Sequence, residues 1–368
     1  MSLFHRRYGG QPWIVPTNVT TGAFRHSAFG QDGRLYIGSQ DNTGIWVLDN
    51  DGIIKQTNIT IGSNYTPTDA KLDGKMLIVS NGAGFWYLDN DNIIKQITNI
   101  VDYPSNAPIT WDMSFFFSGA FLRSDGYVYV FGGSGVYRFR GFNTLESMGL
   151  SGAGGWHGGV LGNDGSVYLT RSVNGAGVVR VEPSGLISSP AYPSGSVNHA
   201  SFSPDYQLYE YGVYDTQSVG LRLLNNNGTF EQTNITSSGF DLIVRDKNHK
   251  TYFFRTRNFA IGATTGNDRG IWMIDEIDGI VKQVDNGSHV VSFGKIGQDK
   301  RLYFGSNIMP VAYQSPGIRY MTKPGFFVKT NKSEGLFFDA AMGQDNKLYF
   351  FSTSGTHGNQ GIWRLELR

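Results

Sequence analysis

Histidines and carboxylates recur at equivalent places in this 368-residue chain. His26, His199 and Asp339 each lie six residues before an aspartate of an expected turn, and Asp241 lies five residues before another. Imidazole and carboxylate groups that converge can bind a metal ion or a polar ligand. The same side chains could instead be solvated groups that line a wet pore. The secondary-structure elements that carry these side chains decide between a ligand site and a solvated pore.

Those elements belong to an internal repeat. Residues 30–58 read GQDGRLYIGSQDNTGIWVLDNDGIIKQTN, and residues 72–99 read LDGKMLIVSNGAGFWYLDNDNIIKQITN. Turn aspartates mark eight such units, spaced 39 to 53 residues apart: Asp32, Asp73, Asp125, Asp164, Asp205, Asp246, Asp299 and Asp345. Because an aspartate present in every unit serves the unit, we expect these carboxylates to stabilise turns rather than to bind calcium.

Each unit contains four short runs with strand character. In the first unit the runs lie at residues 26–29, 35–37, 44–48 and 53–57, separated by Asp-Gly and Asn-Asp-Gly turns. Alternating β-branched and aromatic residues between such turns predict antiparallel hairpins. Four strands in a repeat of 40 to 50 residues are typical of a propeller blade. The sequence therefore predicts an all-β fold, an eight-bladed β-propeller with four antiparallel strands per blade.

The two ends of the chain predict how the ring closes. The eighth unit stops after its third strand at Arg368, while residues 11–18 (QPWIVPTN) resemble the fourth-strand pattern of residues 53–58. We expect residues 11–18 to supply the outer strand of the last blade, which leaves no open seam. Residues 1–368 then form one domain. Its repeats resemble NHL, tectonin and regulator-type propeller repeats, without matching one signature cleanly.

Residues that depart from the repeat are the candidates for recognition. Long spacings place insertions after the outer strands and between the second and third strands, loops that share one face of a propeller. Exposed variable loops on a rigid scaffold commonly bind partners. The resulting candidates for ligand or partner binding are Tyr103, Trp111, Asp112, Trp156, His157, Arg255, Arg257, Phe259, Met309 and Tyr313, together with His26, His199, Asp241 and Asp339 at the channel mouth.

Composition excludes several classes of site. The chain has no cysteine, so thiolate catalysis and cysteine-ligated metals are absent. Lysine and arginine (31) nearly balance aspartate and glutamate (30), which argues against a nucleic-acid partner bound by bulk charge. No apolar run suits a signal peptide or a membrane span. We therefore expect no cofactor, no metal site and no catalytic residue.

The leading interpretation is a non-catalytic recognition or assembly module, and not an enzyme. Its asparagine-, threonine- and glycine-rich style resembles bacteriophage structural proteins, which implies a virion component or host-attachment protein that binds virion proteins or a host receptor. The expected location is the virion, otherwise the cytoplasm. Two alternatives stay open: a lectin-like propeller that binds a surface glycan, and a lyase or hydrolase that uses the channel-mouth histidines and aspartates.

Overall fold

The computed structural model describes most of the chain, and every regular element among the described residues is a β-strand. The described residues are 10–80, 84–109, 117–122, 126–133, 135–151, 156–161, 165–171, 178–182, 184–188, 199–202, 208–211, 221–224, 230–235, 242–245, 250–255, 270–274, 280–285, 291, 293–305, 317–324, 326–353 and 360–368. Within them, no helix is long and apolar enough to cross a bilayer.

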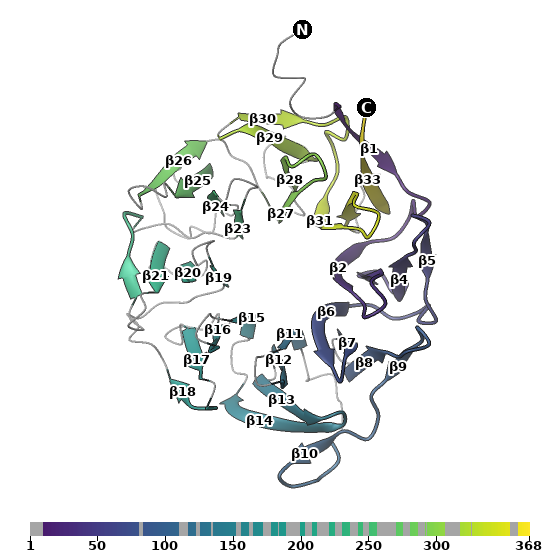
Figure 1. The fold of residues 1–368 in the computed structure, drawn as a ribbon, viewed down its shortest axis with the longest axis vertical. Helices are drawn as coiled ribbons and strands as arrows, with labels where there is room; N and C mark the ends of the chain where they lie inside the picture. The colour runs from purple at the N-terminus through teal and green to yellow at the C-terminus, as the bar shows by residue number, and fades with distance from the viewer. Residues whose placement is uncertain are drawn as a thin grey trace.

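The strands of the described residues form eight sheets that stand side by side in a ring (Figure 1). The first four sheets comprise β2 (Phe24–Phe29), β3 (Leu35–Ser39), β4 (Ile45–Leu48) and β5 (Ile54–Gln56); β6 (Tyr65–Leu72), β7 (Lys75–Ser80), β8 (Gly84–Leu88) and β9 (Ile94–Gln96); β10 (Val101–Tyr103), β11 (Phe117–Leu122), β12 (Val128–Gly132), β13 (Gly135–Gly141) and β14 (Thr144–Ser151); and β15 (Trp156–Leu161), β16 (Val167–Arg171), β17 (Val178–Val181) and β18 (Ile187–Ser188).

The other four sheets continue around the ring to the last strand of the chain. They comprise β19 (His199–Phe202), β20 (Leu208–Tyr211), β21 (Leu221–Leu224) and β22 (Phe230–Gln232); β23 (Leu242–Arg245), β24 (Thr251–Arg255), β25 (Gly270–Ile274) and β26 (Val281–Asp285); β27 (Phe293–Ile296), β28 (Leu302–Gly305), β29 (Arg319–Lys323) and β30 (Phe326–Lys329); and β31 (Phe337–Met342), β32 (Leu348–Ser352), β33 (Ile362–Leu367) and β1 (Pro12–Pro16).

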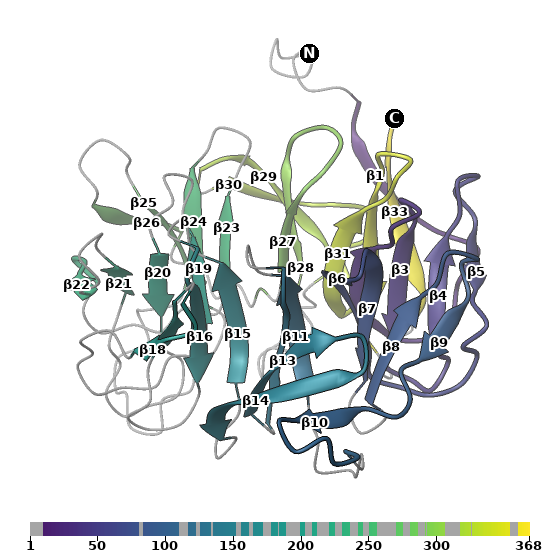
Figure 2. The same ribbon diagram turned by 60° about the horizontal axis from the view of Figure 1, so that its bottom comes forward.

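Each sheet presents its inner strand to the centre of the ring. The inner strands are β2, β6, β11, β15, β19, β23, β27 and β31 (Figure 1). Strands such as β15 and β23 run along the ring axis (Figure 2). Residues at the start of several inner strands are therefore brought towards one region of the axis.

The third sheet differs from the expected four antiparallel strands. It has a fifth strand, β10, which pairs in parallel with the outer strand β14, with Val101 opposite Thr144 and Tyr103 opposite Glu146. The backbone N–H of Val101 donates to the carbonyl of Asn143 at 3.0 Å. The segment predicted as a loop therefore begins as an edge strand on the outside of the ring (Figure 1).

The first and last strands of the chain belong to one sheet. β1 pairs antiparallel with β33, with Pro12 opposite Leu367 and Pro16 opposite Trp363. Ile14 points into the core between this sheet and the seventh, where it is 2% exposed. The outer edge of β33 is thus covered by the start of the chain.

The core lies between neighbouring sheets. Leu35 and Ile37 of β3 pack towards Tyr349 and Phe351 of β32, while Tyr36 packs on the other face against the second sheet. Every residue of β3 is buried because sheets cover it on both sides. This explains why a second strand such as β3 is apolar along most of its length rather than strictly alternating.

A Thr-Asn pair after the outer strand joins each of several sheets to the next. The Nδ2 of Asn58 donates to the carbonyl of Ile94 at 2.8 Å, and the N–H of Ile94 donates to Asn58 Oδ1 at 2.9 Å. The preceding hydroxyl, Thr57 Oγ1, donates to the carbonyl of Ile45 in its own sheet at 2.8 Å. The same two-bond clamp joins Asn18 to Ile54, Asn234 to Val281 and Asn331 to Ile14.

The turn aspartates that the structure describes stabilise their turns, as predicted from the repeat. Asp32, Asp299 and Asp345 each accept the backbone N–H two residues later. Each also accepts the hydroxyl of a tyrosine four residues later, at 2.7 to 2.9 Å. Asp73 instead adopts a left-handed conformation (φ 50°) with Gly74 in a tight hairpin.

Candidate ligand-binding site at the inner strands

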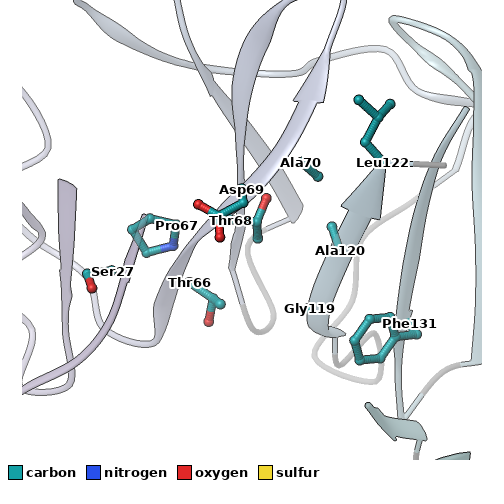
Figure 3. A pocket seen from close by; sticks show the side chains of 10 residues that line it. All are labelled: Ser27, Thr66, Pro67, Thr68, Asp69, Ala70, Gly119, Ala120, Leu122 and Phe131. Atoms are coloured by element: carbon teal, nitrogen blue, oxygen red, sulfur yellow. The ribbon is translucent and has the colours of Figure 1, made fainter. Parts of the chain in front are cut away.

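A cavity of about 460 Å³ lies among the inner strands of the first three sheets. Its walls come from β2, β6 and β11, with one side chain from β12 (Figure 3). The lining residues are Ser27, Thr66, Pro67, Thr68, Asp69, Ala70, Gly119, Ala120, Leu122 and Phe131. This volume suits a small molecule.

Small residues on β11 leave room for the cavity. A Cβ added at Gly119 would lie 2.8 Å from the ring of Phe131, the residue that pairs with it. Gly119 therefore keeps the wall close to the strand behind it, and Ala120 adds little volume. The inner strands are crowded near the axis, and small side chains relieve that crowding.

A bulge in β6 sets the opposite wall. Pro67 pairs with Ile78 and Lys71 with Met76, so three residues of β6 oppose Leu77 alone. Thr68 Oγ1 donates to the carbonyl of Leu77 at 2.8 Å and fixes the bulge. Bulges bend a strand and redirect its side chains. Asp69, in the middle of this bulge, is exposed and lines the cavity (Figure 3).

A second group of polar residues lies where β2 meets β31. The guanidinium carbon of Arg25 lies 4.5 Å from the ring centre of Phe338, and the imidazole of His26 meets the same ring edge-on at 5.9 Å. Arg25 and Phe338 are the extra residues of equivalent bulges, between Phe24 and His26 and between Phe337 and Asp339. Arg25 Nε is buried and has no hydrogen-bond partner among the described residues.

Burial changes the acid–base properties of this group. Burial, together with the adjacent Arg25 charge, lowers the pKa of His26 to about 4. Burial raises the pKa of Asp339, although Lys295 on β27 and the N–H of Ala340, 2.8 Å from Asp339 Oδ1, oppose this rise. At neutral pH, His26 is therefore uncharged.

We predict that His26 makes folding less favourable in mild acid. Its pKa rises from about 4 in the folded chain to about 6.5 when unfolded. The unfolded state therefore binds more protons between these values, and stability falls as the pH drops from about 6.5 to 4, by at most about 3 kcal/mol. Urea unfolding at pH 7, 5.5 and 4 measures this loss.

The substitution His26→Gln is the control for this prediction. It should reduce the loss of folding stability between pH 6.5 and 4. The contribution of Asp339 should remain, and it has the opposite sign, because a carboxyl group whose pKa is raised in the folded state favours folding as the pH falls. An identical pH slope in the wild type and in His26→Gln would contradict the assignment.

The structure separates the residues expected at the site. His26 and Asp339 lie on adjacent inner strands, whereas Tyr103 lies in β10 on the outside of the ring, 4.5 Å from the Arg140 guanidinium. Trp156 begins β15 and is 1% exposed, so it belongs to the core rather than to a loop.

Other expected residues are placed by their backbone or fall outside the description. His157 is the extra residue of the bulge in β15, His199 begins β19 and Arg255 ends β24. The predicted residues that lie outside the described part of the chain are Trp111, Asp112, Asp241, Arg257, Phe259, Met309 and Tyr313.

Sequence reasoning missed Asp69, Arg25 and Phe338. Arg25 and Phe338 directly precede the expected site residues His26 and Asp339, and Asp69 lies at the corresponding part of β6. All three lie in β-bulges, which change the residues that face the axis. A charged residue within the inner-strand run TPTDA was the available signal for Asp69.

Comparisons with known proteins bear on the fold. No family model matches the chain, and no curated protein is similar to it. Solved structures similar to it include a streptogramin B lyase (14% identity, TM-score 0.53, 98% of this chain and 99% of that chain) and the virginiamycin B lyase from Staphylococcus aureus (13%, 0.56, 97% and 99%). The Dos1 propeller is similar too (9%, 0.56, 97% and 95%). The fold is a β-propeller.

These comparisons correct one expectation and leave others without support. The expectation that the chain is not an enzyme is wrong in view of the two lyases among the similar propellers. Catalytic groups on a propeller come from separate blades, so the lack of a contiguous motif does not exclude catalysis. The comparisons support neither an NHL assignment nor a viral, virion or carbohydrate-binding role.

Proposed function

We propose that this chain is an eight-bladed propeller, each sheet one blade and β1 completing the last, that binds a small polar molecule between β2, β6 and β11. The observation that carries the proposal is the cavity of about 460 Å³, lined by hydroxyl groups and one carboxylate on inner strands. Pockets of this size with a few polar groups are typical small-molecule sites.

The rigidity of the walls supports binding. Gly119 and Ala120 belong to a strand paired with β12, and Thr68 is held by its bond to Leu77. A site built on paired strands needs little ordering when the ligand arrives, so less binding energy is lost.

Filling the cavity should abolish binding. We predict that Ala120→Phe weakens binding at least tenfold, because the added ring occupies the space between β6 and β11. Ligand-observed NMR with a set of small sugars, polyols, amines and acids measures this loss. Ala107→Phe makes the same change at an exposed position outside the cavity and should bind like the wild type.

Two results would contradict the proposed site. The first is that no member of the set binds the wild-type chain. The second is that Ala120→Phe and Ala107→Phe both retain wild-type binding, which would place the ligand elsewhere. The virion partners, the host receptor and the location expected from the sequence stay predictions.

A further inference from the structure

We infer that the molecule bound in this cavity carries a positively charged amino group beside hydroxyl groups, and that the Asp69 carboxylate binds the amino group. This inference rests on the proposed function and adds the class of ligand. It follows from the charge of the cavity, from the absence of a partner for Asp69 in the described structure, and from the bulge that holds this residue.

The walls of the cavity carry one charge. Of the ten lining residues, Asp69 is the charged one, and the others are apolar, glycine or hydroxyl-bearing. A negatively charged ligand would be repelled by the Asp69 carboxylate, and a neutral ligand would gain no ion pair with it. A cation gains a charge-assisted hydrogen bond to the carboxylate.

Asp69 also lacks the lysine partner that two aspartates of the turns before β5 and β9 have. Asp49 lies 2.7 Å from Lys55 Nζ, and Asp89 lies 2.5 Å from Lys95 Nζ. No hydrogen bond or ion pair to Asp69 is found in the part of the chain that the structure describes. Its carboxylate is therefore available to a ligand.

Hydroxyl groups line the same cavity as this carboxylate. Ser27 and Thr66 are half-buried and line the cavity on either side of Pro67 in the view of Figure 3. Hydroxyls both donate and accept hydrogen bonds, so they complement ligand hydroxyls without selecting for charge. A ring or short chain that bears an ammonium group and hydroxyls matches both features.

The bulge makes the arrangement specific. Because Thr68 Oγ1 is bonded to Leu77, the backbone around Asp69 is held in the redirected conformation. A regular β6 would pair these residues one to one with β7. The backbone that carries the carboxylate is thus held in place before any ligand binds, which favours selective recognition of a charged group.

A matched set of three sugars tests the inference. Glucosamine, glucose and glucuronate share a ring and differ in carrying a positive, no or a negative charge. We expect glucosamine to bind about 10- to 100-fold more tightly than glucose, as one charge-assisted hydrogen bond would give. Glucuronate should bind more weakly than glucose. NMR titration at low and high salt measures the three affinities.

Asp69→Asn is the decisive variant because it keeps the shape and removes the charge. It should reduce glucosamine affinity about 10-fold or more and leave glucose affinity unchanged. Asp73→Asn removes a carboxylate from the same hairpin outside the cavity and should bind like the wild type. Thermal unfolding of each variant shows that the fold is retained.

The outcomes separate this inference from the proposed function. Equal affinities for glucosamine and glucose, unchanged by Asp69→Asn, would overturn the inference while the cavity remains a binding site. Binding of neutral or acidic molecules from the wider set, without any amine, would also overturn it. If nothing binds, or binding survives Ala120→Phe, the proposed function fails and the inference fails with it.

Discussion

A chain that begins at Thr17 is expected to lose at least about 5 kcal/mol of stability relative to one that begins at Gly10. It lacks β1, so the outer edge of β33 is unpaired, and the buried side chain of Ile14 leaves the core. Removal of one buried isoleucine side chain alone typically costs about 2–5 kcal/mol. Urea unfolding of the two chains measures the difference.

A peptide spanning residues 10–16 should restore part of this stability when added to the shortened chain. The bonds it would recover include that from Ile14 N–H to Asn331 Oδ1 at 2.7 Å. The same peptide with Ile14→Asp should not restore it, because a carboxylate would enter the core beside Phe337 and Leu365. Equal unfolding midpoints for the two chains would show that β1 contributes little.

Asp299→Ala is expected to destabilise the chain by about 3 kcal/mol, several times more than Asp32→Ala. The Asp299 side chain is fully buried, and its Oδ2 accepts the hydroxyl of Tyr303 at 2.7 Å. Removing it leaves that buried hydroxyl without its acceptor and takes away the carboxylate 3.4 Å from Arg301 Nη1, which is costly in a buried site. Asp32 has the same contacts, but its side chain is 16% exposed, so water can replace them.

A double-mutant cycle with Tyr303→Phe isolates the pair. The coupling between Asp299 and Tyr303 should be about 1–3 kcal/mol. Burial, reinforced by the Asp299 charge, raises the pKa of Tyr303, so its ionisation should also require a higher pH in the wild type than in Asp299→Ala. If Asp299→Ala and Asp32→Ala lower the free energy of unfolding equally, burial of the aspartate does not determine how much it stabilises the turn.

The strands were predictable because their signals are local. Runs such as Leu35-Tyr36-Ile37 and the turn that follows Asp32 occur in several units and are found as strands and turns in the structure. The fifth strand of the third sheet was not predictable, since Val101–Tyr103 is short and its parallel pairing with Thr144–Glu146 depends on distant residues.

The candidate site was harder to predict for the same reason. Aligning the repeats by their turn aspartates gives the inner-strand positions, which identified His26 and Asp339. A bulge shifts the face on which later residues lie, and nothing in the local sequence of Thr68–Ala70 marks the three-to-one pairing with Leu77. Asp69 was therefore not among the residues expected at the site.

The Thr-Asn clamps have a practical consequence for producing the protein. Four clamp asparagines, Asn18, Asn58, Asn234 and Asn331, each begin an Asn-x-Ser/Thr acceptor sequence for N-glycosylation. In the folded chain both amide atoms of these residues bind the neighbouring outer strand. A glycan attached to Nδ2 during synthesis in a eukaryotic secretory pathway would obstruct the joints between blades, so such a host should give misfolded chains where a bacterial cytosol gives folded ones.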